Sequence, residues 1–322
     1  IHADTNTQRR FVNWYPNASL SYAFSAQKNI EVRYNGSMNQ PSLNQIQPIR
    51  TNDDPLNIIV GNPGLKPEFR HRINFFYRDY KLLSERGIWM NASYNFTQNA
   101  LSNSSNIDTS GKRTSQTVNV DGNHSLNGYL SYDRKLKKLG MYTGLFANFN
   151  LNANSSIINN LKNTTNSNSY TFGFSLYKSK DKKYDASIRP SATYTDSRSS
   201  INTQTSTKYW TYTIHPDLNI YLPLKFYVHA DADVNLRPKT AVFTNNLNNT
   251  LLNASLGKKF LKNDALVISL SGNDLLNQNI GFNRNTYSNF ISQNTFSTIK
   301  RYFMLTAVWN FTKAGTPAPN NR

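Results

Sequence analysis

The sequence predicts an all-β protein, a transmembrane antiparallel β-barrel, and three observations support this fold class. Apolar and polar residues alternate over long stretches, which is the pattern of β-strands with one apolar face. Short basic turns and long polar loops connect these stretches in regular succession. Only 38% of the 322 residues are hydrophobic, and no window approaches the run of about 18 apolar residues that a membrane helix requires.

The segment 225–237 shows the alternation most clearly. Phe226, Val228, Ala230, Ala232, Val234 and Leu236 share one parity, whereas the residues between them are mostly polar. Residues two apart on a strand point to the same side, so this segment is predicted to have one apolar and one polar face. Similar patterns predict strands at 14–24, 67–80, 88–97, 118–132, 139–153, 170–177, 184–195, 210–222, 264–271 and 301–311.

Two kinds of connection join these strands. Short basic turns lie near 26–28, 82–86, 134–139, 178–183, 223–225 and 257–264. Long polar loops lie near 36–66, 102–115, 155–166, 199–206, 239–249 and 274–295. Their alternation predicts about 13 strands without a helical insertion, and it places every short turn at the same end of the sheet.

A soluble β-sandwich or propeller is the alternative fold. The predicted strands of roughly 10 to 16 residues are much longer than the usual five or six. The separation of short turns from long loops is typical of outer-membrane barrels. Ten residues on a strand tilted by about 45° rise roughly 23 Å, close to the height of the lipid-facing band. We therefore expect the apolar face to contact lipid and the polar face to line a lumen.

Aromatic residues near the short turns share the apolar parity of their strands. Amphipathic rings prefer the headgroup level of a membrane, so these residues are predicted to form one interfacial girdle. The predicted girdle consists of Phe24, Tyr132, Tyr184, Phe226, Phe260 and Phe311.

The net charge of +18 first suggests a nucleic-acid partner. However, roughly 15 of the 36 Lys and Arg residues lie in or beside the six short turns. A nucleic-acid groove would interleave basic residues with stacking aromatics, so no nucleic-acid partner is expected. The charge distribution predicts a rim that faces lipid phosphates on the periplasmic side. The alternative is a docking surface for an acidic periplasmic partner.

Several charged residues have the parity of the polar face. The functional interpretation is a substrate path or a surface that contacts a plug domain, and the simpler interpretation is a solvated lumen wall. A Lys or Arg on the lipid face would cost roughly 2–4 kcal/mol, which alone drives such charges inward. The candidate lumen residues are Asp185, Arg189, His229, Asp231, Asp233 and Arg237.

No catalytic or metal-binding pattern stands out. The chain has no cysteine, and its five histidines lie on different strands without the spacing of metal ligands. We therefore expect neither an enzyme nor a bound metal or cofactor. Pro190 and Pro216 fall in the middle of neighbouring strands with the apolar parity. Because proline cannot donate to a β-ladder, we expect a gap or bulge between strands 184–195 and 210–222.

Residues 61–68, Gly-Asn-Pro-Gly-Leu-Lys-Pro-Glu, resemble a segment of TonB-dependent outer-membrane receptors that precedes a descending strand. Asn273–Gln278 resembles the penultimate hairpin of those barrels, and 301–311 resembles their terminal strand. Asn13-Trp14-Tyr15-Pro16 and the Asn-rich loops are similar to the Bacteroidetes outer-membrane β-barrel family. The matching motif residues are Gly61, Asn62, Pro63, Leu65, Lys66, Pro67 and Glu68.

The resemblance implies the C-terminal part of a receptor barrel, at 1–312, followed by a polar tail at 313–322. Thirteen antiparallel strands cannot close with the usual even count, so we expect about nine further strands and a plug to complete a barrel of about 22 strands. Implied partners are outer-membrane lipid, the missing strands and plug, and the TonB complex.

The resemblance further implies uptake of a scarce solute, with loops 36–66 and 274–295 capturing it. One alternative is a structural subunit of a larger outer-membrane assembly, with the other subunits as partners. A passive porin-like channel is another alternative.

Overall fold

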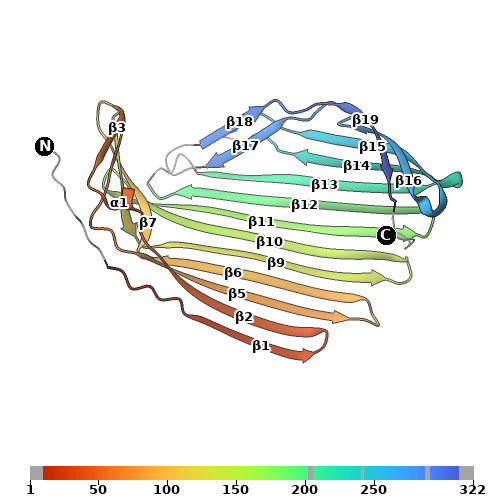
Figure 1. Cartoon of the computed structure of the whole chain (residues 1–322), viewed down its shortest axis with the longest axis horizontal. Coiled ribbons are helices and arrows are strands. Elements are labelled where there is room, and N and C mark those ends of the chain that lie inside the picture. Colours follow the sequence, from red (N-terminus) through yellow and green to blue (C-terminus); the bar gives the residue numbers. More distant parts are fainter. Residues whose placement is uncertain (1–9, 202–205, 241–242, 287–290, 312–322) are drawn as a thin grey trace.

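The computed structural model of the chain describes residues 10–201, 206–240, 243–286 and 291–311, and most of them lie in one large β-sheet (Figure 1). Thirteen of its 17 strands form an antiparallel meander, in which each strand pairs with the next. In order they are β1 (Asn17–Ser25), β2 (Lys28–Asn39), β5 (Glu68–Lys81), β6 (Arg86–Gln98), β9 (Asn123–Leu136), β10 (Met141–Ile158), β11 (Leu161–Lys180), β12 (Tyr184–Ser199), β13 (Thr207–Tyr221), β14 (Phe226–Leu236), β15 (Asn249–Phe260), β16 (Leu266–Asn273) and β19 (Tyr302–Trp309).

The cross-strand register keeps apolar residues on one face of the whole meander. Directly opposed residues of an antiparallel pair lie on the same face. One such row crosses eight strand pairs and contains almost only apolar or aromatic residues. The row is Leu20, Val32, Phe75, Ala92, Gly128, Phe149, Tyr170, Tyr194 and Trp210. The predicted separation into an apolar and a polar face is therefore confirmed.

This apolar face does not form a protein core. Leu145, Leu270 and Leu305 on it are 59%, 54% and 74% exposed. Buried hydrophobic side chains such as Ile58, Leu65, Ala100 and Val120 instead cluster at the loop end of the sheet. The sheet therefore needs an apolar environment outside itself.

The loop end carries additional structure. The β2–β5 connection forms the short helix α1 (Leu43–Ile46) and the hairpin of β3 (Arg50–Asp54) and β4 (Asn57–Val60). The β6–β9 connection, predicted as a plain loop, forms a hairpin of β7 (Ala100–Ile107) and β8 (Arg113–Val120). Strands β4 and β8 pair in parallel, which joins the two connections. The connection from β16 to β19 contains a separate hairpin of β17 (Gly281–Thr286) and β18 (Ile291–Phe296).

Three predicted boundaries are wrong. The segment 155–166 is not a loop, because β10 and β11 run through it to a two-residue turn at Asn159 and Asn160, with φ angles of 47° and 65°. The predicted strand 118–132 is divided at Gly122, whose φ is 111°. The last strand ends at Trp309 rather than at Phe311. The predicted tail 313–322 lies outside the described residues.

The predicted gap between the proline-containing strands is also wrong. The β12–β13 ladder is continuous through Pro190, which opposes Ile214, and Pro216, which opposes Ile188. The interruptions lie on the other side of each strand. Bridges are missing between β11 and β12 beside Pro190, and between β13 and β14 beside Pro216. Each proline therefore lacks an N–H donor on the outer side of the pair. Pro190 has none to offer β11, and Pro216 has none to offer β14.

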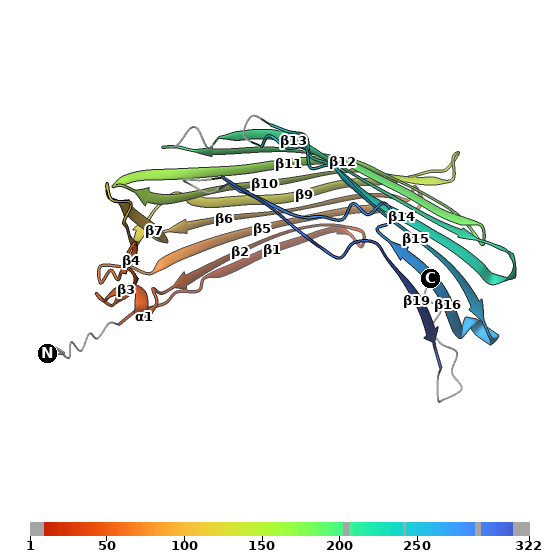
Figure 2. The same ribbon diagram turned by 90° about the horizontal axis from the view of Figure 1, so that it is seen from above.

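The sheet is open. Within the described residues, β1 and β19 do not pair with each other, and they form the two free borders in Figures 1 and 2. Every residue of β1 is exposed. Strand β1 leads into the short turn at 26–27. Strand β19 pairs with β16, and just after its end the Asn310 N–H donates to the carbonyl oxygen of Ala265 in another short turn. Both border strands therefore run toward the short-turn end.

Candidate functional site

The motif segment 61–68 closes the loop end of the sheet. A Cβ on Gly61 would lie 1.6 Å from the carbonyl oxygen of Gln47, so only glycine fits there. The Asn62 N–H donates to Gln45 O at 2.6 Å, and the Asn62 side-chain amide donates to Thr117 O at 3.0 Å. Asn62 therefore joins α1 to β8.

The middle of the segment turns tightly and then docks on β8. The N–H of Gly64 donates to Asn62 Oδ1 at 2.9 Å, so Asn62 also shapes the turn that contains Pro63. Leu65 is buried, with 2% of its surface exposed. The N–H of Lys66 donates to Asn119 Oδ1 and its carbonyl accepts from Asn119 Nδ2, both at 2.8 Å. This reciprocal pair fixes the chain before Pro67 leads into β5.

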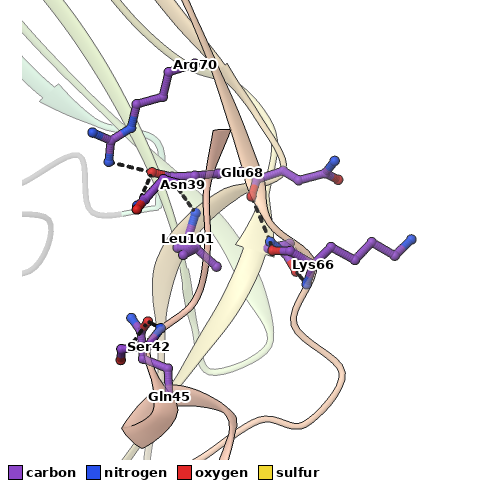
Figure 3. Close-up of polar contacts among 9 residues, drawn as sticks. Asn39, Ser42, Gln45, Lys66, Glu68, Arg70 and Leu101 are labelled. Carbon is purple, nitrogen blue, oxygen red and sulfur yellow. Dashed lines mark hydrogen bonds and ion pairs between the residues drawn. The ribbon is translucent and has the colours of Figure 1, made fainter. Parts of the chain in front are cut away.

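Glu68 is the polar centre of this arrangement (Figure 3). It is only 3% exposed, although it is the first residue of β5. Its carboxylate accepts hydrogen bonds from Asn39 Nδ2 at 3.0 Å and from the Leu101 N–H at 2.8 Å, and it pairs with Arg70 at 2.5 Å. A buried carboxylate needs such partners, and here they come from β2, β5 and β7.

We call residues 61–68 together with Asn39, Leu101 and Asn119 the outer clasp. A capping contact steadies the nearby helix, because the Ser42 N–H donates to Gln45 Oε1 at 2.8 Å (Figure 3). The interactions of the clasp are hydrogen bonds, one ion pair and the packing of buried Leu65. Its chemistry is that of a rigid support for the outer loops.

A second cluster lies on the polar face of β13 and β14. We call His215, Asp217, His229, Asp231 and Asp233 the lumen cluster. The His215 ring is hydrogen-bonded to Asp233 through Nδ1. His229 Nε2 lies 3.1 Å from Asp231, and its Nδ1 lies 3.8 Å from Asp217.

Neighbouring amides complete the lumen cluster. Asn219 donates to Asp217 at 3.1 Å and shares a hydrogen bond of 3.0 Å with His229. Asn253 of β15 donates to Asp231 at 2.8 Å. In the part of the chain that the structure describes, no His, Asp and Glu residues are arranged to hold a metal ion. The cluster is a hydrogen-bonded polar wall with an excess of carboxylates.

The remaining predicted lumen residues lie outside this cluster. Arg189 opposes His215 in the register, but its guanidinium stacks 4.4 Å from the Phe146 ring centre. Asp185 lies nearer the short-turn end, where Tyr221 donates to it at 2.8 Å. Arg237 lies at the loop end, 3.2 Å from Asn249 Oδ1 and 4.9 Å from the Phe282 ring centre.

Sequence reasoning missed His215 and Asp217. Both have the polar parity of the predicted strand 210–222, so extending the parity argument to them would have found them. The opposite part of the polar face is basic, since β2 and β5 contribute Arg33, Arg72 and Arg78 there. The polar wall is thus acidic over β12–β14 and basic over β2 and β5.

The comparisons with known proteins agree with this architecture. A family described as "Outer membrane protein beta-barrel family" matches residues 2–311. The chain belongs to this outer-membrane β-barrel family. Comparisons with curated proteins and with solved structures find no match.

The family places the protein in the outer membrane, with the apolar face of the sheet toward lipid and the polar face toward a lumen. The short turns are then periplasmic and the long loops are external. Among the described residues, no helix has the length and apolar content needed to cross a membrane.

The residues proposed for a girdle lie at the periplasmic end of this outer-membrane barrel sheet. Lys28 lies 4.9 Å from the Phe24 ring centre, and Lys258 lies 4.4 Å and 5.1 Å from those of Phe226 and Phe260. Tyr132 opposes Ile88 and Leu145, and Tyr184 opposes Ile220. Phe311 follows β19 and lies 5.6 Å from the Trp309 ring. Lysines therefore lie over three of these six rings, and the girdle itself stays a prediction.

A second aromatic group lies toward the external end of the same face. The rings of Tyr194 and Trp210 are 5.1 Å apart, and those of Trp210 and Tyr212 are 6.4 Å apart. Tyr184 and Tyr194 have the same parity on β12 and are separated by a strand length that rises roughly 23 Å at a tilt near 45°. This spacing fits the height of an apolar band between two aromatic belts, of which only the periplasmic one is predicted from the sequence.

The periplasmic turns are bound to one another by charge. Lys225 donates a hydrogen bond of 2.8 Å to Asp264, and Lys259 lies 3.6 Å from the same carboxylate. The hydrogen bond from Lys225 is the main cause that lowers the pKa of Asp264. Similarly, hydrogen bonds from Tyr142 and Lys135 lower the pKa of Glu85. Acidic groups in these turns thus stay ionised among the surrounding lysines.

Proposed function

We propose that the chain is the C-terminal barrel part of a TonB-dependent outer-membrane receptor that takes up a scarce solute. The observation that carries the proposal is the open sheet, whose thirteen meander strands present one lipid-facing and one polar face. The segment 61–68, which resembles a segment of those receptors, adds support because it forms the outer clasp. The proposed role is transport without catalysis.

The direction of the border strands limits how the barrel is completed. Unpaired backbone groups are too costly to leave in lipid, so β1 and β19 each require a further strand. Both run toward the periplasm, and an antiparallel neighbour of each must run outward. The completing segment therefore has an odd number of strands, as about nine strands would provide for a barrel of about 22. A second copy of this sheet cannot serve, because its borders also run toward the periplasm.

The polar wall supplies a surface for a plug and for the solute. We propose that the lumen cluster, together with Asp185 and Arg189, contacts the plug. The basic part of the polar face over β2 and β5 would contact acidic residues of the plug. The external loops 36–66 and 274–295 would capture the solute, with the outer clasp holding the first of them. Energy from the TonB complex would then move the plug and open the lumen.

The open borders also support a second candidate function. Strands supplied by a separate chain would complete the sheet equally well, which is what a structural subunit of a larger outer-membrane assembly requires. In that case β1 and β19 would be interfaces between subunits, and transport would be absent. A passive channel would need a closed, unplugged lumen.

A depletion experiment tests the proposed uptake. Cells with and without the protein are grown in a complex medium, and the solutes removed from the medium are quantified by mass spectrometry. The same comparison is made in cells that lack TonB. We expect one solute class to remain in the medium in both deficient strains. Depletion that persists without TonB would indicate a passive channel. Unchanged depletion together with co-purifying barrel chains would indicate a structural subunit.

A further inference from the structure

We propose that the periplasmic end of β5, β6 and β9 binds the phosphate group of an anionic phospholipid from the inner leaflet. The site consists of Lys81, Arg86 and Arg134, which we call the cation row, and of an adjacent groove lined by leucines. The proposal is independent of transport, because this site lies on the lipid-facing side of the sheet.

The register places the three cations side by side. Lys81 opposes Arg86, and Arg86 opposes Arg134. All three have the parity of the apolar face, which they share with Tyr77, Ile88 and Tyr132 on the same strands. Like charges at directly opposed positions repel each other, so this arrangement needs a source of negative charge.

The protein supplies too little negative charge at this place. Asp79 lies 3.4 Å from Arg86, whereas the carboxylate of Glu85, the residue before Arg86, is taken up by Lys135 outside the row. Asp79 also directly opposes Lys28 of β2. The Arg86 Nε is buried without a hydrogen-bond partner, and neither Lys81 nor Arg134 forms an ion pair among the described residues. The row therefore keeps at least two uncompensated charges.

The height of the row matches the phosphate level. Arg134 lies two residues beyond the girdle residue Tyr132, and Arg86 lies two residues beyond Ile88, toward the turns. Residues just beyond an aromatic girdle lie among the headgroups. Two arginines can each bind phosphate oxygens through paired N–H groups, a geometry that a lipid phosphodiester satisfies.

The adjacent groove lies on the periplasmic side of the cation row, at the level of the lipid headgroup beyond its phosphate. It encloses about 700 Å³ and is lined by Leu83, Ser84, Arg134, Lys135, Leu136, Lys137, Lys138 and Leu139. Leu83 is 91% exposed and Leu139 is 58% exposed, which is unfavourable for leucines that face water alone.

Two contacts hold the walls of this groove in place. Lys137 donates to Leu83 O at 3.0 Å, and Lys135 pairs with Glu85 at 2.9 Å. The groove is thus preformed, with Arg134 at its membrane side. An acidic protein could reach the turns, but it could not reach Lys81 and Arg86 on the lipid face as directly as a lipid does.

Native mass spectrometry of the intact protein, purified from outer membranes and exchanged into nanodiscs, tests the proposal. The discs contain phosphatidylglycerol mixed with phosphatidylcholine, and the bound lipids are identified after release. We expect selective retention of phosphatidylglycerol, and a roughly thirtyfold weaker retention in R86Q/R134Q, because each cation near an anionic surface contributes about a factor of five. The R86K/R134K variant keeps both charges but loses the paired N–H groups, so it is expected to retain phosphatidylglycerol more weakly than the unmodified protein and more tightly than R86Q/R134Q.

The matched control is K182Q/K183Q, which removes two positive charges from another periplasmic turn. It should retain phosphatidylglycerol like the unmodified protein. Equal loss in both double variants would show a diffuse effect of net charge and overturn the site. Equal retention of both lipids, or tighter binding of an acidic peptide than of phosphatidylglycerol, would also overturn it. Resistance to heat unfolding on gels verifies that each variant is folded.

Discussion

The carboxylate of Glu68 accepts a hydrogen bond of 2.8 Å from the N–H of Leu101, so the first residue of β5 holds the beginning of β7. Glu68→Ala removes this acceptor and leaves a partly buried N–H unpaired, at a cost of roughly 1–3 kcal/mol. We expect hydrogen exchange at Leu101 to accelerate by about five- to 150-fold. Glu31→Ala, which removes a carboxylate paired only with nearby Arg33, is the control and should leave exchange at Leu101 unchanged. Unaltered exchange in Glu68→Ala would contradict the role of the outer clasp.

Gly61 is the position where the outer clasp tolerates a side chain least. A methyl group there would overlap the carbonyl oxygen of Gln47, whereas at Gly64 the nearest atom would lie 3.1 Å away. We expect Gly61→Ala to displace the β2–β5 connection and expose it to protease, while the barrel strands stay intact. Gly64→Ala should be cut at a rate close to that of the unmodified protein. Equal resistance of both variants to protease would contradict the close contact between Gly61 and the Gln47 carbonyl.

The assignment of the two faces can be tested on neighbouring residues of β10. Ala147 has the lipid-facing parity and Asn148 has the lumen parity. Ala147→Arg is expected to reduce the free energy of folding into vesicles by up to the roughly 2–4 kcal/mol that arginine costs at the bilayer centre, since its charge must leave water. Asn148→Arg should change it little. Urea titrations of both variants measure the difference, and a larger cost for Asn148→Arg would reverse the assignment.

The strand pattern could be predicted from the sequence because lipid imposes an apolar residue at every second position. The same rule explains the failure at 155–166, where β10 and β11 extend beyond the membrane. There both faces carry Asn, Ser and Thr, so the strands show no alternation although they pair as far as Ile158 and Leu161. Parity also identifies the face of a side chain without showing which neighbour its N–H points to. For that reason the gap beside Pro190 is predicted between β12 and β13, whereas it lies between β11 and β12.

The sites were harder to predict because they depend on register between strands. The lumen cluster joins His229 and Asp231 to Asp217 across β13 and β14, and only the register shows that these side chains meet. The buried position of Glu68 depends on β7, which the sequence does not distinguish from a polar loop. In contrast, the cations of the periplasmic rim were visible in the sequence, although the adjacency of Arg86 and Arg134 was not.

The periplasmic turns should respond to pH through Asp264. Its hydrogen bond from Lys225 lowers its pKa in the folded state, so ionised Asp264 stabilises the turns. This contribution is complete above the ordinary pKa of about 4 and is lost as the pH falls through the lower folded value. We expect hydrogen exchange at 261–265 to accelerate in that window, and Asp264→Asn to remove the pH dependence. Asp181→Asn in another turn serves as the control, and a dependence that survives in Asp264→Asn would exclude Lys225–Asp264 as its source.

The most direct test concerns the open borders of the sheet. The chain contains no cysteine, so pairs can be introduced freely and joined in the membrane with a short bifunctional maleimide. Leu20→Cys with Val32→Cys, which oppose each other across β1 and β2, is the positive control. Leu20→Cys is then combined in turn with cysteine at Phe303, Leu305 or Ala307 of β19. We expect efficient cross-linking in the control and none between β1 and β19, because we propose that other strands lie between them in the complete barrel. Cross-linking of β1 to β19 as efficient as in the control would show that these strands close on each other and would exclude a larger barrel.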